Sequence, residues 1–382
     1  MFSSTFSDRI QRMKKRRKGS PEQVKVAMES YRGMAMDGLE SYDVLKSVLS
    51  SQEEWERRGK GDNATRYVIG AMQPVESQYT EVSVKTAKRI ENQLEKRLSE
   101  HQLDFRLQGS VALDIHIKGF SDVDLLVIDK QMLMYDRGGV RQHLYTPTTK
   151  NEDDVILILR NMARDELKKA FPEADVDDEN NKSLRITGGS LQREVDVVPA
   201  IWWDSSDYQV TQEESDRGVM ILHREKRERI YNSPFVHIKR IESKCNRSNG
   251  GLRKSIRLLK TVKADCKDEG TEIGLNSYDI TSIMYHADEN NLRHSAYYEL
   301  AVLVETHRWL NYLCAHPDEA KKMDVPNGTR KIFEDDASLN ELFKLTDVIN
   351  NLVAEVMNEL SGDFGRRLTV NESELLKSHR VL

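Results

Sequence analysis

The spacing of apolar residues changes twice along this chain, and this constrains its fold more than any other feature. From residue 63, apolar residues recur three or four apart as far as Leu98, the stripe of one long amphipathic helix with Pro74 as the site of a kink. Short β-like runs follow, between residues 105 and 222. Beyond Pro234 the spacing is again helical. The pattern predicts an α+β fold, in which a mixed α/β core is followed by a helical domain.

Individual elements follow from the local patterns. The runs expected to form strands are residues 105–107, 115–117, 123–128, 184–187, 194–198 and 219–222. Within them, residues 184–198 are typical of a β-hairpin whose turn contains Gly188-Gly189-Ser190. Asp153-Asp154 is expected to cap a helix that reaches Leu167. The later helices are expected over residues 252–262, 278–286, 297–313 and 339–360.

The length and these patterns suggest three parts. A chain of 382 residues fits two domains, or one domain with a large helical appendage. Residues 1–60 are interpreted as a peripheral helical extension, with short helical patterns around residues 24–36 and 42–55. The α/β core is expected over residues 61–232 and the helical domain over 233–382.

Charge and cysteine spacing exclude several classes of protein. The net charge of -5 argues against a protein that coats nucleic acid with its whole surface. The 3 cysteines show neither CxxC nor zinc-ligand spacing, so we expect reduced thiols. We find no apolar run of membrane-spanning length and no signal-peptide pattern, and we expect a cytoplasmic protein without a membrane partner.

Positive charge is concentrated in two clusters within an otherwise acidic chain. The first twenty residues contain seven basic residues and one acidic residue, and we interpret this basic head as a solvated terminal segment. Residues 239–263 contain nine basic residues and one acidic residue. One of the two clusters is expected to meet phosphates.

Two carboxylates stand two residues apart where an apolar β-like run begins. Asp122 and Asp124 alternate with Val123 and Leu125. Because alternate residues of a strand point to the same side, both carboxylates lie on one face while the apolar residues face a core. Such a pair suits a hard divalent cation that also binds phosphates. The alternative is a solvated strand face with chance alternation.

A third carboxylate is expected from a neighbouring strand, because a two-metal centre clamps both the attacking and the leaving oxygens of a displacement at phosphorus. Asp196 supplies it, standing among β-branched neighbours in residues 195–198. A carboxylate there is costly unless a metal or another cation compensates its charge. Glu194 lies on the same face of the strand and remains the rival candidate.

A glycine turn precedes the acidic pair. Eleven residues separate the run Gln108-Gly109-Ser110 from Asp122. Glycine lets the backbone approach a ligand closely, and Ser110 offers a hydroxyl and an amide donor to a triphosphate.

These motifs together resemble the pattern of the polymerase-β nucleotidyltransferases. They are Gly109-Ser110, Asp122-Val123-Asp124 and the segment 195–200, Val-Asp-Val-Val-Pro-Ala. Within that superfamily the chain is most similar to the bacterial cGAS/DncV-like enzymes, over residues 63–320. The resemblance implies a polymerase-β-like core of a mixed sheet flanked by helices, with a long N-terminal spine helix. It further implies a C-terminal helical domain like that of the oligoadenylate synthases.

Two segments of the helical domain extend the resemblance. Residues 256–260 resemble the helix whose lysine reaches the donor phosphates, and Asn276-Ser277-Tyr278 resembles the Ser-Tyr element whose hydroxyl contacts the same triphosphate. The implied substrate-binding residues are Gln108, Gly109, Ser110, Lys260, Ser277 and Tyr278. The implied catalytic residues, which also bind two Mg²⁺ or Mn²⁺ ions, are Asp122, Asp124 and Asp196.

The resemblance implies a template-independent enzyme that makes a cyclic di- or trinucleotide from ATP and other NTPs, with release of pyrophosphate. A downstream effector in anti-phage signalling would read the product, and the family leaves room for a protein activator. The zinc-bearing insertion of animal cGAS is not visible, so long nucleic acid is not an expected partner. A linear or tRNA-modifying nucleotidyltransferase with the same triad is the alternative enzyme, and a degenerate nucleotide-binding module is the non-enzymatic one. The intact triad argues against the module, while only the product separates the two enzymes.

Other conspicuous residues are assigned no chemistry. Trp202 and Trp203 are expected in or beside the core, since adjacent aromatic residues after a strand are rarely a pair of stacking platforms. His116, His237 and His286 show no metal-ligand spacing.

Overall fold

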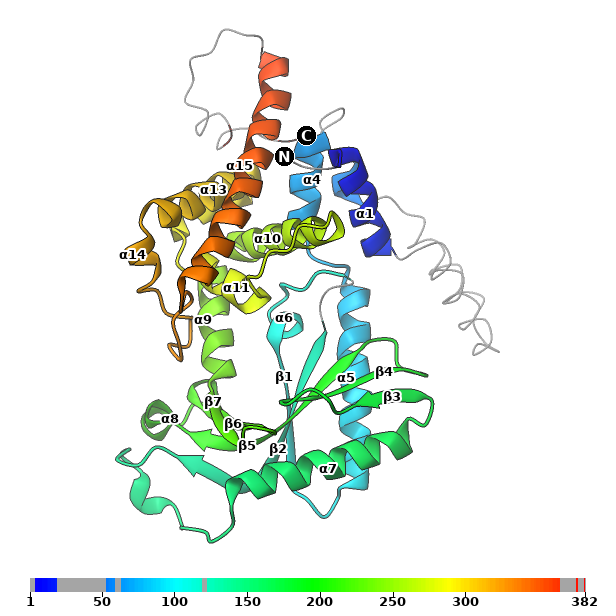
Figure 1. Cartoon of the computed structure of the whole chain (residues 1–382), viewed down its shortest axis with the longest axis vertical. Coiled ribbons are helices and arrows are strands. Elements are labelled where there is room, and N and C mark those ends of the chain that lie inside the picture. Colours follow the sequence, from blue (N-terminus) through cyan, green and yellow to red (C-terminus); the bar gives the residue numbers. More distant parts are fainter. Residues whose placement is uncertain are drawn as a thin grey trace.

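The structure, a computed structural model, has a lobe built on a sheet and a lobe built of helices (Figure 1). It describes residues 4–18, 53–58, 63–118 and 122–364, together with 376 and 381. In Figure 1 the lobe with the sheet, including α7 and α8, lies in the lower half and the helical lobe in the upper half, and α9 (Pro234–Arg247) runs between them. No described helix is long and apolar enough to cross a bilayer.

The lower lobe contains one seven-stranded mixed sheet. Its path is β1-β2-β5-β4-β3, and the second half of β5 also pairs with β6, which pairs with β7. The pair β2·β5 is parallel and every other pair is antiparallel. The strands are β1 (Leu103–Gln108), β2 (Val123–Tyr135), β3 (Ala174–Asp177), β4 (Leu184–Gly188), β5 (Val195–Asp204), β6 (Gly218–His223) and β7 (Glu228–Asn232).

The remaining elements divide between the lobes. Those beside the sheet are α5 (Ser77–Arg97), α6 (Gly109–Ala112), η2 (Gln142–Leu144), α7 (Glu152–Ala170), α8 (Ser206–Thr211) and η3 (Glu214–Asp216). The upper lobe contains α1 (Phe6–Lys18), η1 (Glu54–Arg57), α4 (Asn63–Met72), α10 (Gly251–Asp268), α11 (Ser277–Tyr285), α12 (Glu289–Arg293), η4 (His294–Ala296), α13 (Leu300–Ala315), α14 (Pro317–Ala320) and α15 (Asp336–Phe364).

The alternation of residues along β2 divides the core of the lower lobe into two. Val123 and Leu125 belong to a buried cluster that includes Leu94 of α5 and Leu159 of α7. The next residue, Leu126, belongs to a separate cluster on the other face, with Trp202 and Phe235. The helices α5 and α7 therefore cover one face, and the even-numbered residues from Asp124 to Ile128, ahead of the register shift in β2, point away from them.

The predicted single helix over residues 63–98 is wrong, because the chain forms two helices there. Helix α4 ends at Met72 and α5 begins at Ser77, with Pro74 in the connection. Proline has no N–H to donate and restricts the residue before it, so the first helix ends ahead of it. Residues of α4 pack in the core of the helical lobe, whereas those of α5 pack under the sheet.

Two further predictions need correction. Residues 115–117 form no strand but an irregular segment in which Ile115 and His116 are buried. Helix α7 is capped by Asn151, whose side chain accepts hydrogen bonds from the backbone of Asp153 and Asp154, so these two residues do not cap it. The helical patterns expected over residues 24–36 and in most of 42–55 lie outside the described residues.

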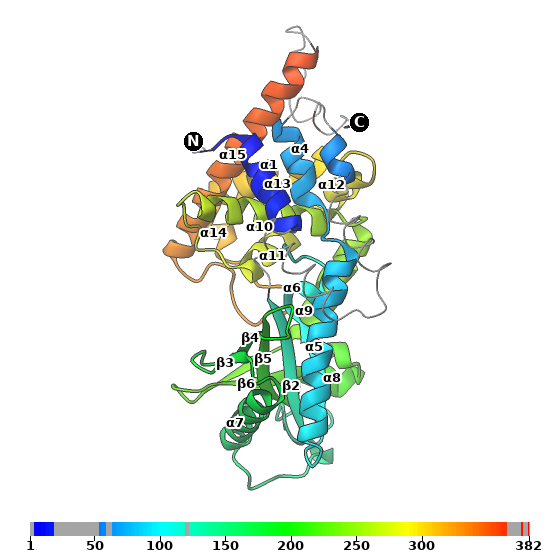
Figure 2. The ribbon, with the colours of Figure 1, turned by 90° about the vertical axis from the view of Figure 1, so that its right-hand side faces the viewer.

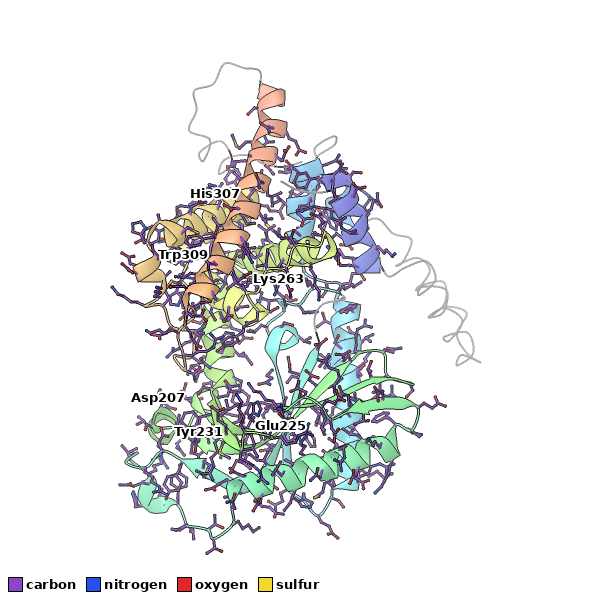
Figure 3. The ribbon with its side chains drawn as sticks, in the orientation of Figure 1. Asp207, Glu225, Tyr231, Lys263, His307 and Trp309 are labelled. Carbon is purple, nitrogen blue, oxygen red and sulfur yellow. The ribbon has the colours of Figure 1, made fainter. Side chains whose placement is uncertain are left out.

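The other predicted elements are present. The β4·β5 pair confirms the predicted hairpin, and β1, β2 and β6 contain their predicted runs. Helices α7, α10, α11, α13 and α15 occupy the predicted helical segments to within a few residues. Trp202 is buried, as expected, and Trp203 makes an edge contact with Tyr231. Figure 3 labels Tyr231 in the lower lobe.

The basic head is docked against α10, and its interpretation as a solvated segment is wrong. Arg9 is fully buried and donates to both carboxylate oxygens of Glu269 at 2.8 and 2.6 Å. Arg12 and Arg16 form ion pairs with Asp265 at 3.6 and 2.7 Å. Figure 2 shows α1, α4 and α10 together in the upper part of the molecule. The positive charge of α1 is thus opposed by the acidic residues at the end of α10. The division of the chain into three domains stays a prediction.

Replacing Arg9 with alanine should lower the free energy of unfolding by about 2 kcal/mol, because Glu269 loses its buried bidentate partner while Arg12 still contacts it. Urea denaturation followed by circular dichroism measures this. As a control, Arg97→Ala removes a partly exposed arginine that pairs with Glu166 at 3.4 Å, and should change stability by at most about 0.5 kcal/mol. Equal stabilities of the Arg9 variant and the parent protein would contradict the buried ion pair.

Candidate active site

A pocket of about 350 Å³ lies where the sheet meets the helical lobe. Its lining brings together eight residues predicted from sequence: Gln108, Gly109, Ser110, Asp122, Asp124, Lys260, Ser277 and Tyr278. Asp196 is not among the lining residues but is next to Asp124 in the sheet. A larger and more open hollow of about 510 Å³ beside Glu214 and Lys239 contains neither the glycine turn nor the aspartates. The chemistry predicted from sequence therefore belongs to the smaller pocket.

Strand register decides how the carboxylates meet. Asp124 pairs with Asp196 across the parallel strands β2 and β5, so their side chains emerge side by side on one face. On its other side, Asp124 pairs with Gln108 of β1. The backbone N–H of Val123 donates to the carbonyl of Glu194, which places Glu194 one step further along the same edge. Asp196 is therefore the register partner of Asp124, and Glu194 is nearer to the level of Asp122.

Burial and the neighbouring negative charges raise the pKa values of Asp124 and Asp196. Burial, followed by the charges of Asp196 and Asp122, raises the pKa of Asp124 to about 7, although Lys260 opposes this shift. Burial also raises the pKa of Asp196, against the hydrogen bond and charge of Arg185. A cluster whose negative charges are only partly compensated has the electrostatics of a cation site.

Arg185 of β4 forms ion pairs with this cluster. It is the register partner of Asp196 across the antiparallel β4·β5 pair. Its guanidinium lies 2.9 Å from the Glu194 carboxylate, 3.3 Å from Asp196 and 3.8 Å from Asp122. Across the described ranges, no group of three or more His, Cys, Asp or Glu side chains converges as metal ligands do. The carboxylates are oriented toward Arg185 and the glycine turn. Their assignment as metal ligands therefore stays a prediction.

The glycine turn makes close contact with the acidic strand. Gly109 has a φ of 73°, a left-handed conformation that favours glycine. A Cβ atom at this position would overlap with Oδ2 of Asp124. Ser110 follows at the start of the short helix α6 and lines the pocket. The glycine therefore allows the turn and the carboxylate to share one small space.

Helix α10 connects the pocket to the helical lobe through three basic side chains. Arg253 donates to the carbonyl of Leu113 at 2.8 Å and Arg257 to that of Asp114 at 3.2 Å. Lys260 donates to the carbonyl of Ile115 at 3.0 Å. These spacings of four and three residues place the donors on one side of the helix.

Lys260 is both buried and part of the pocket. Burial lowers the pKa of its ammonium group to about 8, while the nearby Asp124 opposes this shift. The group is therefore charged at neutral pH and loses that charge in mildly alkaline solution.

Most of the basic cluster over residues 239–263 makes structural contacts, and the expectation that one of the two basic clusters meets phosphates stays a prediction. Besides Arg253 and Arg257, Lys244 donates to the carbonyls of Tyr285 and Ala287. Lys263, labelled on α10 in Figure 3, donates to the carbonyl of Leu275. Such bonds compensate carbonyl groups that helix ends and loops leave without partners. Within the cluster, Lys260 is the basic residue that lines the pocket with the aspartates.

The start of α11 forms the opposite wall. Ser277 is the first residue of this helix, and the side chain of Asn276 caps it by accepting from the backbone of Asp279. A helix N-terminus carries free N–H groups and a positive end of the helix dipole, which favour an anion. Tyr278 also lines the pocket, and its hydroxyl donates to Asn327 at 3.0 Å.

A family model for the cGAS/DncV-like nucleotidyltransferase C-terminal helical domain matches residues 239–358. The cyclic dinucleotide synthase CdnE of Yersinia aleksiciae is 63% identical over 362 residues, which cover 95% of each chain. The chain belongs to the cGAS/DncV-like nucleotidyltransferases. This family membership confirms the resemblance seen in the sequence.

Solved structures of other cGAS/DncV-like nucleotidyltransferases share the fold. The STING-associated CdnE c-di-GMP synthase from Capnocytophaga granulosa superposes with a TM-score of 0.68 at 23% identity, covering 93% of this chain and 99% of that one. The CdnE cyclic dinucleotide synthase of Elizabethkingia meningoseptica, solved with GTP and Apcpp, has a TM-score of 0.55 at 17% identity, covering 74% and 96%. The predicted α+β fold, a polymerase-β-like core with a helical C-terminal domain, is confirmed.

Two residues of this nucleotidyltransferase site escape sequence reasoning. Arg185 is one, because the register that sets it opposite Asp196 depends on the loop of residues 189–194. His237 is the other: its ring stacks on Tyr278 at 4.5 Å between centroids, and its Nδ1 is buried without a hydrogen-bond partner. Burial lowers the pKa of His237 to about 4, so the ring is neutral at pH 7. Helical spacing did reveal a helix after Pro234, but not which lobe each of its side chains faces.

Gly109→Ala should reduce nucleotidyl transfer about 100-fold, because the added methyl group displaces Asp124 or the turn by roughly 1 Å. The matched control is Gly138→Ala, at a glycine with a φ of 93° whose Cβ would meet no atom within 4 Å. Both variants introduce backbone strain, and only the first disturbs the carboxylate. Product formation from labelled NTPs measures the effect, and equal activities of the two variants would contradict the steric argument.

Proposed function

We propose that this chain condenses nucleoside triphosphates into a cyclic dinucleotide, with release of pyrophosphate. The observation that carries the proposal is the convergence of Asp124 with the Gly109 turn, Lys260 and the start of α11 around one pocket. The 63% identity with the Yersinia cyclic dinucleotide synthase, over 95% of both chains, supports a cyclic product. A relative solved with GTP and Apcpp supports NTPs as substrates.

The residues around the carboxylate cluster fit divalent metal ions. Oxygen ligands from a few carboxylates, completed by substrate phosphates, are what Mg²⁺ takes in phosphoryl-transfer enzymes. We assign Asp122 and Asp124 to the ion beside the triphosphate, and Asp124 and Asp196 to a second one. When bound, two Mg²⁺ or Mn²⁺ ions would neutralise phosphate charge and favour deprotonation of the attacking hydroxyl. The raised pKa of Asp124 marks the negative charge that such ions would compensate.

The chain itself binds and orients the donor triphosphate. Gly109 allows the backbone to approach the phosphates, and Ser110 adds its hydroxyl and amide as donors. Lys260 supplies a positive charge from the opposite lobe. Ser277 presents a hydroxyl at the N-terminus of α11, where the helix dipole also favours phosphate. These groups hold the α-phosphorus in line with the ribose hydroxyl that attacks it, and a second transfer in the same pocket closes the ring.

Family membership is consistent with a wider biological role. We propose that the cyclic product is a signal that a downstream effector reads in anti-phage defence. A protein activator and a cytoplasmic location stay predictions.

The product decides between cyclic and linear synthesis. Purified protein is incubated with the four labelled NTPs and Mg²⁺ or Mn²⁺, treated with phosphatase, and its products are identified by mass spectrometry. We expect a phosphatase-resistant cyclic dinucleotide. A ladder of linear products with free termini would instead identify a linear nucleotidyltransferase.

Asp122→Asn, Asp124→Asn and Asp196→Asn should each abolish the product, because each removes a proposed metal ligand while keeping the shape of the side chain. Glu194→Gln should retain activity within about tenfold of the parent, because its carboxylate is assigned no metal. The same mass-spectrometric assay measures all four variants. Loss of activity in Glu194→Gln with survival in Asp196→Asn would reverse the assignment of the third ligand.

The pH dependence of substrate binding should report the charge of Lys260. Because burial lowers its pKa to about 8, the ammonium charge is present at pH 7 and is lost as the pH rises above 8. The KM for ATP should therefore be about tenfold higher at pH 9 than at pH 7. In Lys260→Arg the guanidinium stays charged, so KM should be flat over this range. A rise of the same size in both proteins would place the titrating group elsewhere.

A further inference from the structure

Arg185 lies inside the proposed metal site, on the same face of the sheet as the carboxylates. It stands opposite Asp196 in the β4·β5 register, and its guanidinium contacts Asp196, Asp122 and Glu194 within 4 Å. No other lysine or arginine in the described part of the chain forms an ion pair with any of these three carboxylates. The guanidinium therefore compensates the charge that a divalent cation would compensate.

The three contacts of Arg185 differ in distance and in the exposure of the carboxylate. They divide its partners into a partly exposed carboxylate at short range and two carboxylates at longer range. The shortest, 2.9 Å, is to Glu194, whose side chain is 33% exposed. Asp196, at 3.3 Å, is only 14% exposed, and Asp122 is at 3.8 Å. The arginine side chain is itself 41% exposed, so it can move toward solvent without a large desolvation change. Glu194 can keep Arg185 after the other two carboxylates have released it.

We propose that Arg185 is a resident counter-ion that holds Asp122 and Asp196 while no divalent cation is bound, and moves onto Glu194 when the cation takes these two aspartates. The proposal rests on the metal-dependent function proposed above. It gives the two acidic residues of β5 different roles, with Asp196 as a metal ligand and Glu194 as the anchor of the displaced guanidinium. Arg185 is then a positioning residue that competes with the metal.

Competition between Arg185 and the metal predicts the direction in which metal affinity changes when the arginine is removed. A positive charge within a few ångströms of a bound cation repels it, and its removal should tighten metal binding. A merely structural arginine would have the opposite effect or none, because disorder of the carboxylates can only weaken the site. Metal affinity in the absence of nucleotide therefore separates the two roles.

The experiment is a Mn²⁺ titration of the full chain without nucleotide, in which electron paramagnetic resonance measures free Mn²⁺. Arg185→Gln should lower the Kd for Mn²⁺ about tenfold, and Arg185→Ala should do the same, whereas Arg185→Lys should remain near the parent value. The matched control is Arg229→Gln on β7 of the same sheet, whose side chain is 35% exposed and pairs with Asp153 and Glu152. This control should leave the Kd unchanged. Thermal unfolding verifies that each variant is folded.

A double-mutant cycle tests the role of Glu194. In the Arg185→Gln background, Glu194→Gln should weaken Mn²⁺ binding clearly less than Asp196→Asn does, because it removes a nearby negative charge but no ligand. If Glu194 were itself a metal ligand, the two changes would weaken binding in that background by similar factors of about tenfold or more.

The outcomes separate this proposal from the one on which it rests. Tighter Mn²⁺ binding in Arg185→Gln alone supports the counter-ion. An unchanged or weaker affinity, or an equal gain in Arg229→Gln, overturns it and leaves the metal site intact. If neither the parent protein nor Arg185→Gln binds Mn²⁺, even with a non-hydrolysable ATP analogue present, the metal site fails and the counter-ion fails with it.

Discussion

The arrangement of the site depends on α10, which holds the irregular segment 113–115 against the helical lobe. Arg253, Arg257 and Lys260 donate to three successive carbonyl groups of that segment. Leaving such a buried donor without a partner would cost about 1–3 kcal/mol, so the segment and the helix stay together. Because this segment directly follows the Gly-Ser turn and α6, the bonds also fix that turn relative to the helix that carries Lys260. The lobes are thus joined at the place where a triphosphate would bind.

The second constraint is the two-sided character of β2. Val123 and Leu125 pack under α5 and α7. Asp124, the residue between them, must therefore point to the opposite face of the sheet. Asp124 is therefore held beside Asp196 although the two carboxylates repel each other, and burial together with this repulsion raises the pKa of Asp124 to about 7. The apolar packing stabilises a face that is electrostatically unfavourable without a cation. Arg185 compensates part of that charge, and the divalent ions proposed above would compensate more of it.

Prediction from the sequence succeeded where one element explains the pattern and failed where two must meet. The hairpin, the strand with Asp124 and most helices follow from local periodicity. The segment 115–117 has the alternation of a strand, yet Lys260 donates to the carbonyl of Ile115, and no strand among the described residues pairs with the segment. The stripe from residue 63 to 98 is continuous in hydrophobicity, but its two halves pack in different lobes on either side of Pro74.

The sequence by itself determined which side chains share a face and which family the chain resembles, because the two-residue repeat of a strand and the spacing of motifs are properties of the local backbone. It could not determine which elements and side chains contact one another in the folded chain. Tertiary structure decided that α1 lies on α10 and that Asp196 is level with Asp124. It also decided that Arg185 and His237 enter the site. Strand register and helix packing are set by the joint burial of apolar surface from segments far apart in the chain, so no local pattern contains them.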